Sequence, residues 1–107
     1  VNNNVKNAWF FAGNLESLFR ENLEAQKLIS PDVIILDPPR AGINKNTIND
    51  ILNKIPKKII YVSCNPSTQA RDIAIFCENE YNLTKIRPVD MFPHTPHVEN
   101  VATLIRN

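Results

Sequence analysis

Glycine is scarce in this chain: among its 107 residues only Gly13 and Gly42 are glycines. A nucleotide-binding β–α unit carries a glycine-rich first turn, because its backbone must come close to the phosphates. No such turn occurs here, and the chain begins at Val1 in an asparagine-rich stretch rather than at Met. We therefore expect the chain to be a piece of a longer protein, and this piece does not contain a glycine-rich loop.

Strong charge, long apolar runs and a set of paired cysteines are missing as well. The net charge is +1 and the isoelectric point is about 8.0, below the value of about 9 that is typical of dedicated nucleic-acid-binding domains. Hydrophobic residues make up 43% of the chain, which is enough for a core, but they are too scattered for a membrane span. With two cysteines and no targeting segment, we expect a reducing, cytoplasmic setting without a membrane.

Apolar runs and helical periodicity alternate along the chain. We expect strands at 8–12, 33–36, 57–62, 83–91 and 98–105, and helices at 15–27, around 48–55 and at 66–80. The runs at 33–36 and 59–62 are continuously apolar, as in buried parallel strands. Alternating strands and helices favour an α/β fold with a parallel sheet, and the last two strands should pair antiparallel as an edge hairpin.

Cys64 follows one of these apolar runs and precedes Asn65 and Pro66, which suit the N-cap and first position of a helix. The cysteine should therefore lie at the carboxyl end of a strand, where open α/β sheets bind ligands. A helix N-terminus favours the thiolate over the thiol, which makes this sulfur a nucleophile. A buried core cysteine is the competing interpretation.

Cys77 belongs to a different pattern. Ala70, Ile73, Ala74 and Cys77 recur at the spacing of one helix face, and all are apolar. We therefore expect Cys77 to be an inert core residue and no disulfide between the two cysteines.

Asp37 ends the apolar run 33–36 and is followed by Pro38, Pro39 and Arg40. Two prolines make the backbone stiff and extended, and this should hold the carboxylate toward the cleft. A strand stop with a turn is the alternative. Arg40 and Arg71 each follow a motif at the cleft edge, so both are candidates for phosphate contacts.

Glu99 opens the last strand, after a segment in which Pro93 and Pro96 precede His94 and His97 within a stiff loop. Taken alone, such a glutamate is a solvated edge-strand residue. The spacing H-x-x-H-x-E matches none of the common zinc patterns, and the prolines hinder convergence on one ion. We therefore expect no metal site.

A thiolate, an acidic group at the neighbouring strand end and a second carboxylate suit one reaction. C5 of a pyrimidine is too weakly nucleophilic to take a methyl group, but addition of a cysteine to C6 puts electron density on C5. A base must then remove the C5 proton so that the cysteine leaves. Cys64 and Glu99 supply these two roles, and Asp37 is placed to hold the base edge of the pyrimidine.

Three motifs, D-P-P-R at 37–40, S-C-N-P at 63–66 and F-P-x-T-x-H-V-E at 92–99, resemble those of the RNA uracil-5 methyltransferases that use S-adenosylmethionine. The resemblance covers residues 32–107. It implies a class I methyltransferase fold of Rossmann-like type, in which residues 1–107 are the C-terminal portion and the parallel sheet ends in an antiparallel β hairpin. The donor-binding loop, the N-terminal RNA-binding domain and the iron–sulfur cluster of many members would then lie upstream.

By this resemblance, Cys64 is the nucleophile and Glu99 is the proton acceptor. Asp37 is similar to the residue between uracil and the methyl donor, and Asn14 matches a contact to the donor's adenosine part. Pro38 and Arg40 are expected to bind the substrate together with Asp37. The segment 90–95 is more similar to the ribosomal-RNA branch than to the transfer-RNA branch. We expect the chain by itself to be inactive and to bind the donor poorly.

Two other functions stay open. An amino-methyltransferase would use Asp37, Pro38 and Pro39 to bind an amine and would need no cysteine. A non-catalytic α/β binding module would tolerate replacement of Asp37, Cys64 and Glu99 without loss of function.

Overall fold

The computed structural model of the chain describes residues 31–90 and 98–107. Its elements, in chain order, are β1 (Val33–Leu36), α2 (Lys45–Lys54), β2 (Lys58–Ser63), α3 (Pro66–Glu78), β3 (Tyr81–Val89) and β4 (Glu99–Arg106). The predicted α/β class is confirmed, and the bounds agree with those expected to within two or three residues. The strand expected at 8–12, the helix at 15–27, the residue Asn14 and the loop at 92–97 lie outside the described residues.

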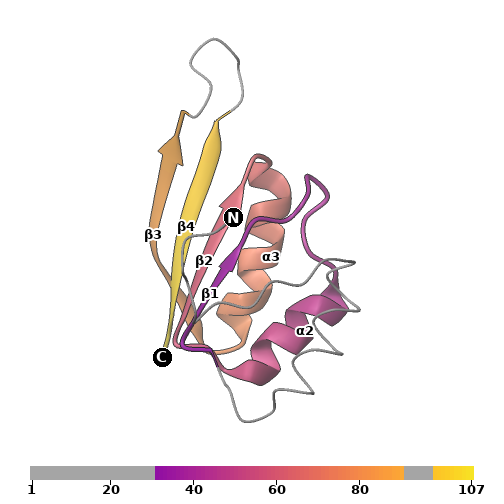
Figure 1. Cartoon of the computed structure of the whole chain (residues 1–107), viewed down its shortest axis with the longest axis vertical. Helices are drawn as coiled ribbons and strands as arrows, with labels where there is room; N and C mark the ends of the chain where they lie inside the picture. Colours follow the sequence, from indigo (N-terminus) through magenta and orange to yellow (C-terminus); the bar gives the residue numbers. More distant parts are fainter. Residues whose placement is uncertain (1–30, 91–97) are drawn as a thin grey trace, which may run out of the picture.

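The four strands form one sheet in the order β1-β2-β4-β3 (Figure 1). β1 and β2 run parallel, with Leu36 beside Tyr61, whereas β4 is antiparallel to both of its neighbours. The antiparallel pairing of the last two strands is thus confirmed, and their hairpin occupies one side of the sheet, with β3 outermost and β4 next to β2. Because β4 runs antiparallel to β2, its first residue lies at the same end of the sheet as the carboxyl ends of β1 and β2.

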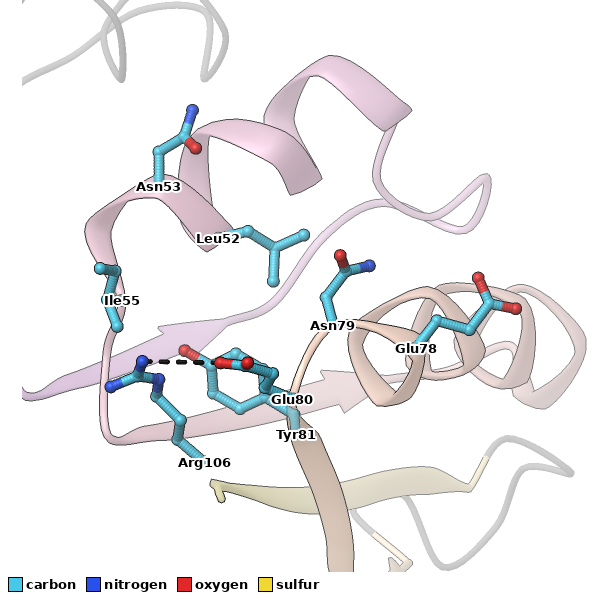
Figure 2. A pocket seen from close by; sticks show the side chains of 8 residues that line it. All are labelled: Leu52, Asn53, Ile55, Glu78, Asn79, Glu80, Tyr81 and Arg106. Carbon is cyan, nitrogen blue, oxygen red and sulfur yellow. Dashed lines mark ion pairs between the residues drawn. The ribbon is translucent and has the colours of Figure 1, made fainter.

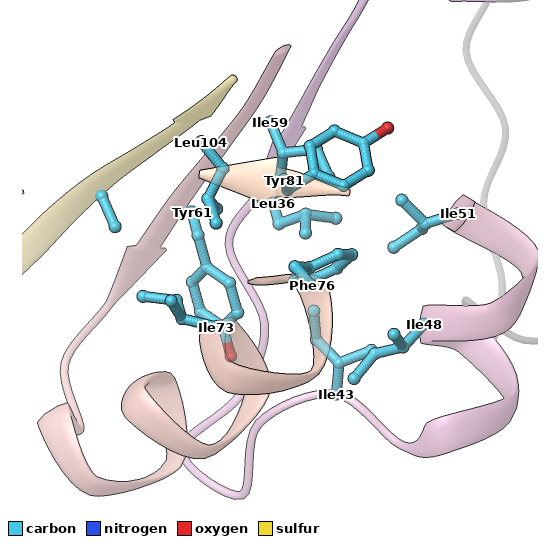
Figure 3. Close-up of a cluster of buried hydrophobic side chains, with 11 residues drawn as sticks. Leu36, Ile43, Ile48, Ile51, Ile59, Tyr61, Ile73, Phe76, Tyr81 and Leu104 are labelled. Carbon is cyan, nitrogen blue, oxygen red and sulfur yellow. The ribbon is translucent and has the colours of Figure 1, made fainter. Parts of the chain in front are cut away.

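Both helices pack against one face of the sheet and enclose the core (Figure 3). Alternate residues of β2 and β4 point to this face, because side chains of a strand alternate between the two faces. The buried apolar side chains are Leu36, Ile43, Ile48, Ile51, Ile59, Tyr61, Ile73, Phe76, Tyr81, Ala102 and Leu104. Phe76 and Tyr81 meet edge to face, with ring centroids 6.2 Å apart.

The opposite face of β1 is open to solvent in the described part of the chain. Val33 is 47% exposed and Ile35 is 69% exposed, so the expectation that the whole run 33–36 is buried was wrong for these two residues. The two described helices cover only the face to which Leu36 points. In the residues described, the longest helix, α3, has 13 residues, and no helix is long and apolar enough to cross a membrane.

The buried face of α3 is shifted by one position along the helix from the expected face, so that only Ile73 is common to both. Gln69, Asp72, Ile73 and Phe76 are buried, whereas Cys77 is exposed. The expectation of a core Cys77 was therefore wrong. Counting only apolar residues misplaced the face, because two of the positions that point inward carry polar side chains with hydrogen-bond partners.

The end of α2 departs from the expected pattern too. Ile55 was expected to belong to the helix, but it is the C-cap, with φ 52° and ψ 51°, and is 51% exposed. Its N–H donates to the carbonyl of Leu52 at 3.1 Å, and Pro56 follows, which cannot continue the helix. A β-branched residue is strained in this left-handed conformation, which glycine adopts readily.

We predict that Ile55→Gly raises the free energy of unfolding by about 1 kcal/mol, because glycine relieves the left-handed strain at the helix end. Asn53→Gly, in the exposed last turn of the same helix, is the matched control and should lower stability by a few tenths of a kcal/mol. Urea unfolding followed by circular dichroism measures both. A loss of stability in Ile55→Gly would contradict the conformation described here.

Candidate active site

Asp37, Cys64 and Glu99 all lie at one end of the sheet, where the neighbouring strands β1 and β2 stop and β4 starts. Asp37 directly follows β1, Cys64 directly follows β2, and Glu99 is the first residue of β4. The ladder between β2 and β4 ends at the pair Ser63 and Asn100, so one further step of the same register places Cys64 opposite Glu99. Neighbouring strands are about 5 Å apart, so this register places the backbones of Cys64 and Glu99 side by side.

The backbone on both sides of Cys64 is held by hydrogen bonds between residues close in the sequence. The Ser63 hydroxyl accepts from the N–H of Asn65 at 3.0 Å and donates to the carbonyl of Asn65 at 3.1 Å. The Asn65 side chain accepts from the N–H of Ser67 at 3.1 Å, and Pro66 opens α3. The predicted N-cap is thus confirmed, and Cys64, which is partly buried, sits at the N-terminus of α3 in a fixed turn.

The segment after β1 forms a tight loop. The N–H of Gly42 donates to the carbonyl of Pro39 at 2.9 Å, which closes a turn around Arg40 and Ala41. The Asp37 side chain is exposed at the sheet edge and Pro38 is partly buried. The carboxylate is therefore accessible to a ligand at the same edge as Cys64.

The first turns of α3 hold this loop in place. The carbonyl of Arg40 accepts from Asn65 Nδ2 at 3.1 Å and from Thr68 Oγ1 at 2.9 Å, and the carbonyl of Ala41 accepts from Arg71 Nη2 at 2.9 Å. The backbone of Arg40 is fixed while its side chain is exposed, which suits a phosphate contact. Arg71 uses part of its guanidinium within the chain, a role that the sequence pattern did not indicate.

Two other residues were missed by the sequence reasoning. Gln69 and Asp72 are 1% and 0% exposed, and both contact groups close to the predicted site. The available signal was the spacing of these polar residues with Ile73 and Phe76, which is that of one helix face.

A hollow at the opposite end of the strands, beside the start of β3 and the end of β4, contains none of the predicted site residues (Figure 2). It is bordered by Leu52, Asn53, Ile55, Glu78, Asn79, Glu80, Tyr81 and Arg106. Arg106 and Glu80 form an ion pair across it at 3.6 Å, and both side chains are substantially exposed. In the part of the chain that is described, no group of three or more metal-ligating side chains occurs.

Comparison with known proteins identifies one family. A family model described as tRNA (Uracil-5-)-methyltransferase matches residues 18–107. A protein of Porphyromonas gingivalis named "Uncharacterized RNA methyltransferase" is 49% identical over 106 residues, which are 98% of this chain and 23% of that protein. A protein of Bacteroides thetaiotaomicron with the same name is 49% identical over 102 residues, 95% of this chain and 22% of that protein. The chain thus spans less than a quarter of the length of these relatives.

Solved structures agree with the fold. The Pyrococcus abyssi tRNA (uracil-54, C5)-methyltransferase, in complex with S-adenosyl-L-homocysteine, has a TM-score of 0.61 and 47% identity. The match covers 69% of this chain and 18% of that one. The complex of M1.HpyAVI with SAM has a TM-score of 0.67 at 11% identity over 91% of this chain and 52% of that one, and this likeness supports the fold alone.

We predict that Gly42→Ala lowers the free energy of unfolding by about 1–3 kcal/mol. Gly42 has φ +85°, and an added Cβ would lie 2.6 Å from Arg71 Nη2 and 2.7 Å from Asp72 Oδ2. Ala41→Gly changes the exposed neighbouring residue and should alter stability by less than about 1 kcal/mol. Equal stability of Gly42→Ala and the unsubstituted protein in urea unfolding would show that the loop does not pack against α3 as described.

Proposed function

This chain belongs to the tRNA (uracil-5-)-methyltransferase family, and on that basis we propose that the protein that carries it methylates C5 of a uridine in RNA through a covalent bond from Cys64 to C6. The proposal is supported by the register of β2 and β4, because its continuation by one residue sets the partly buried Cys64 opposite Glu99. Both residues then lie at the strand ends where open α/β sheets bind ligands.

In the proposed reaction, the Cys64 thiolate adds to C6 of uracil, a sulfur–carbon bond forms, and electron density moves to C5 and its neighbouring carbonyl. After methylation, C5 carries both the methyl group and its hydrogen. Glu99 removes that proton, the electron pair restores the C5–C6 double bond, and the bond from sulfur to C6 breaks. The uridine leaves as 5-methyluridine and the thiolate is regenerated.

Asp37 is the described residue that fits the donor side of this site. S-adenosylmethionine, when bound, supplies an electrophilic methyl group on a positively charged sulfur. The exposed carboxylate of Asp37 at the sheet edge suits such a charge and the polar edge of uracil, so we assign it to both. Asn14 is proposed to contact the adenosine part of the donor, and we propose that the isolated chain is inactive because most of the donor site lies outside it.

For RNA contacts, we propose the exposed side chain of Arg40 as a phosphate ligand and Pro38 as part of the wall beside the base. Arg's planar group suits phosphate recognition. On the basis of segment 90–95, we propose ribosomal RNA as the substrate. We also propose that the protein is cytoplasmic. Transfer RNA is the second candidate, since the Pyrococcus neighbour is named for a tRNA uridine. Methylation of each purified RNA by the whole enzyme separates the two.

We predict that Cys64→Ala lowers the methylation rate at least about 10³-fold, as expected when a covalent nucleophile is removed. Cys77→Ala, which removes the exposed second thiol, is the matched control and should keep full activity. Methyl transfer to RNA by the whole enzyme is the measurement. Full activity of Cys64→Ala would instead support an amino-methyltransferase that uses the D-P-P segment without a nucleophilic cysteine.

We predict a different result for Glu99→Gln. The amide cannot accept the C5 proton, so the reaction should stop after methylation with RNA still bonded to Cys64. A denaturing gel should show this protein–RNA complex on ordinary uridine-containing RNA, where the unsubstituted enzyme shows little. Normal turnover of Glu99→Gln would exclude Glu99 as the base.

A further inference from the structure

Two buried polar side chains of α3 have no part in the reaction as described so far. Gln69 is 1% exposed and Asp72 is 0% exposed. Burying an amide or a carboxylate is costly unless its hydrogen-bonding groups are satisfied. An apolar residue at either position would give an ordinary helix–sheet contact. Polar groups at these two positions must therefore be stabilised by the hydrogen bonds that they make.

Asp72 links the loop after β1 to β2. Its Oδ2 accepts from the N–H of Ile43 at 2.9 Å and from the hydroxyl of Tyr61 at 2.6 Å, both within the core. Its Oδ1 accepts from Arg71 Nε at 3.1 Å, and Arg71 in turn bonds to the loop carbonyl of Ala41. Burial, and then the bond to Asp72, raises the pKa of Tyr61, so the phenol stays protonated and donates a hydrogen bond to the carboxylate. The loop that begins at Asp37 is thereby tied to β2.

Gln69 links β2 to β4. Its Nε2 donates to the carbonyl of Tyr61 at 3.1 Å and to the carbonyl of Asn100 at 3.0 Å. Asn100 is the residue after Glu99, and Tyr61 lies three residues before Cys64. One amide group therefore spans the two strands whose ends carry the proposed nucleophile and base.

We propose that Gln69 and Asp72 are positioning residues of this enzyme: Gln69 sets Glu99 against Cys64, and Asp72 sets the Asp37 loop against the same strand. This inference rests on the proposed function. Both links converge on Tyr61 of β2: its carbonyl accepts a hydrogen bond from Gln69, and its hydroxyl donates one to Asp72.

The two links affect different steps. Removal of the C5 proton depends on the distance from Glu99 to a uracil that is already bonded to Cys64, and this distance depends on the Gln69 link. Binding of the donor and the base depends on Asp37, and hence on the Asp72 link. A displacement of about 1 Å at a reacting group costs about 100-fold in rate, so each link should have a measurable and separate effect.

The test uses the whole enzyme with Gln69→Met, which keeps the side-chain volume but cannot donate, and with Asp72→Asn. Ile73→Val, on the same buried face of α3, is the control for loss of packing. Three quantities are measured for each variant: the melting temperature, the rate of methylation at varied substrate concentration, and the amount of covalent complex on ordinary uridine RNA. RNA with 5-fluorouridine, whose C5 fluorine cannot leave as a proton, reports the addition and methylation steps alone.

For Gln69→Met, we expect adduct formation with 5-fluorouridine RNA within about threefold of normal, and turnover on ordinary RNA at least about tenfold slower, with accumulation of the covalent complex. Asp72→Asn should raise KM for the methyl donor about tenfold without that accumulation. Ile73→Val should lower the melting temperature only. Gln69→Asn, whose shorter amide cannot reach both carbonyls, takes the place of Gln69→Met if the latter does not fold, with the same expected result.

The proposal is overturned if both Gln69 variants, or Asp72→Asn, lose activity only in proportion to their loss of folded protein, as Ile73→Val does. A failure of the proposed function looks different. In that case the unsubstituted enzyme forms no adduct with 5-fluorouridine RNA at Cys64, and the positioning role falls with it.

Discussion

The antiparallel pairing of β4 with β2 is the constraint on which the candidate site depends. Cys64 and Glu99 are 35 residues apart in the sequence, and the α3–β3 segment lies between them. The ladder from Lys58 and Ile105 to Ser63 and Asn100 removes that separation. A slip of one residue would turn every side chain of β4 to the other face of the sheet, and would bury Val101 and Thr103 in place of Ala102 and Leu104. The packing of the core and the alignment of the site are therefore set by the same register.

α3 adds the precision that the sheet alone does not provide. Strand pairing fixes which residues are neighbours, but the ends of strands fray and loops vary. In this chain the side chains of α3 hold the loop after β1 and the start of β4 through hydrogen bonds to their backbone. No buried side-chain nitrogen or oxygen in the described residues lacks a hydrogen-bond partner. A fully satisfied polar network of this kind makes a site rigid, whereas a partly satisfied one would destabilise the core.

The sequence was enough to predict most of the described fold and the residues at the sheet edge. Asn65 and Pro66 marked the start of α3, and Asp37 and Cys64 were identified because each follows an apolar run. The missed features share one cause. Gln69, Asp72 and the left-handed Ile55 are placed by tertiary contacts, and local hydrophobic patterns do not report which polar residue has a partner inside the core. The position of β4 inside the sheet, next to β2, also depends on long-range pairing that no local signal encodes.

The most direct test of the central claim, that Cys64 and Glu99 meet at one uracil, is a crystal structure of the whole enzyme trapped on 5-fluorouridine RNA. If they do, the structure will contain a bond from Cys64 Sγ to C6 and a Glu99 carboxylate oxygen about 3–3.5 Å from C5, with Gln69 still bridging the two strands. A uracil bonded to Cys64 with Glu99 directed away from C5, or no bond to Cys64 at all, would contradict it.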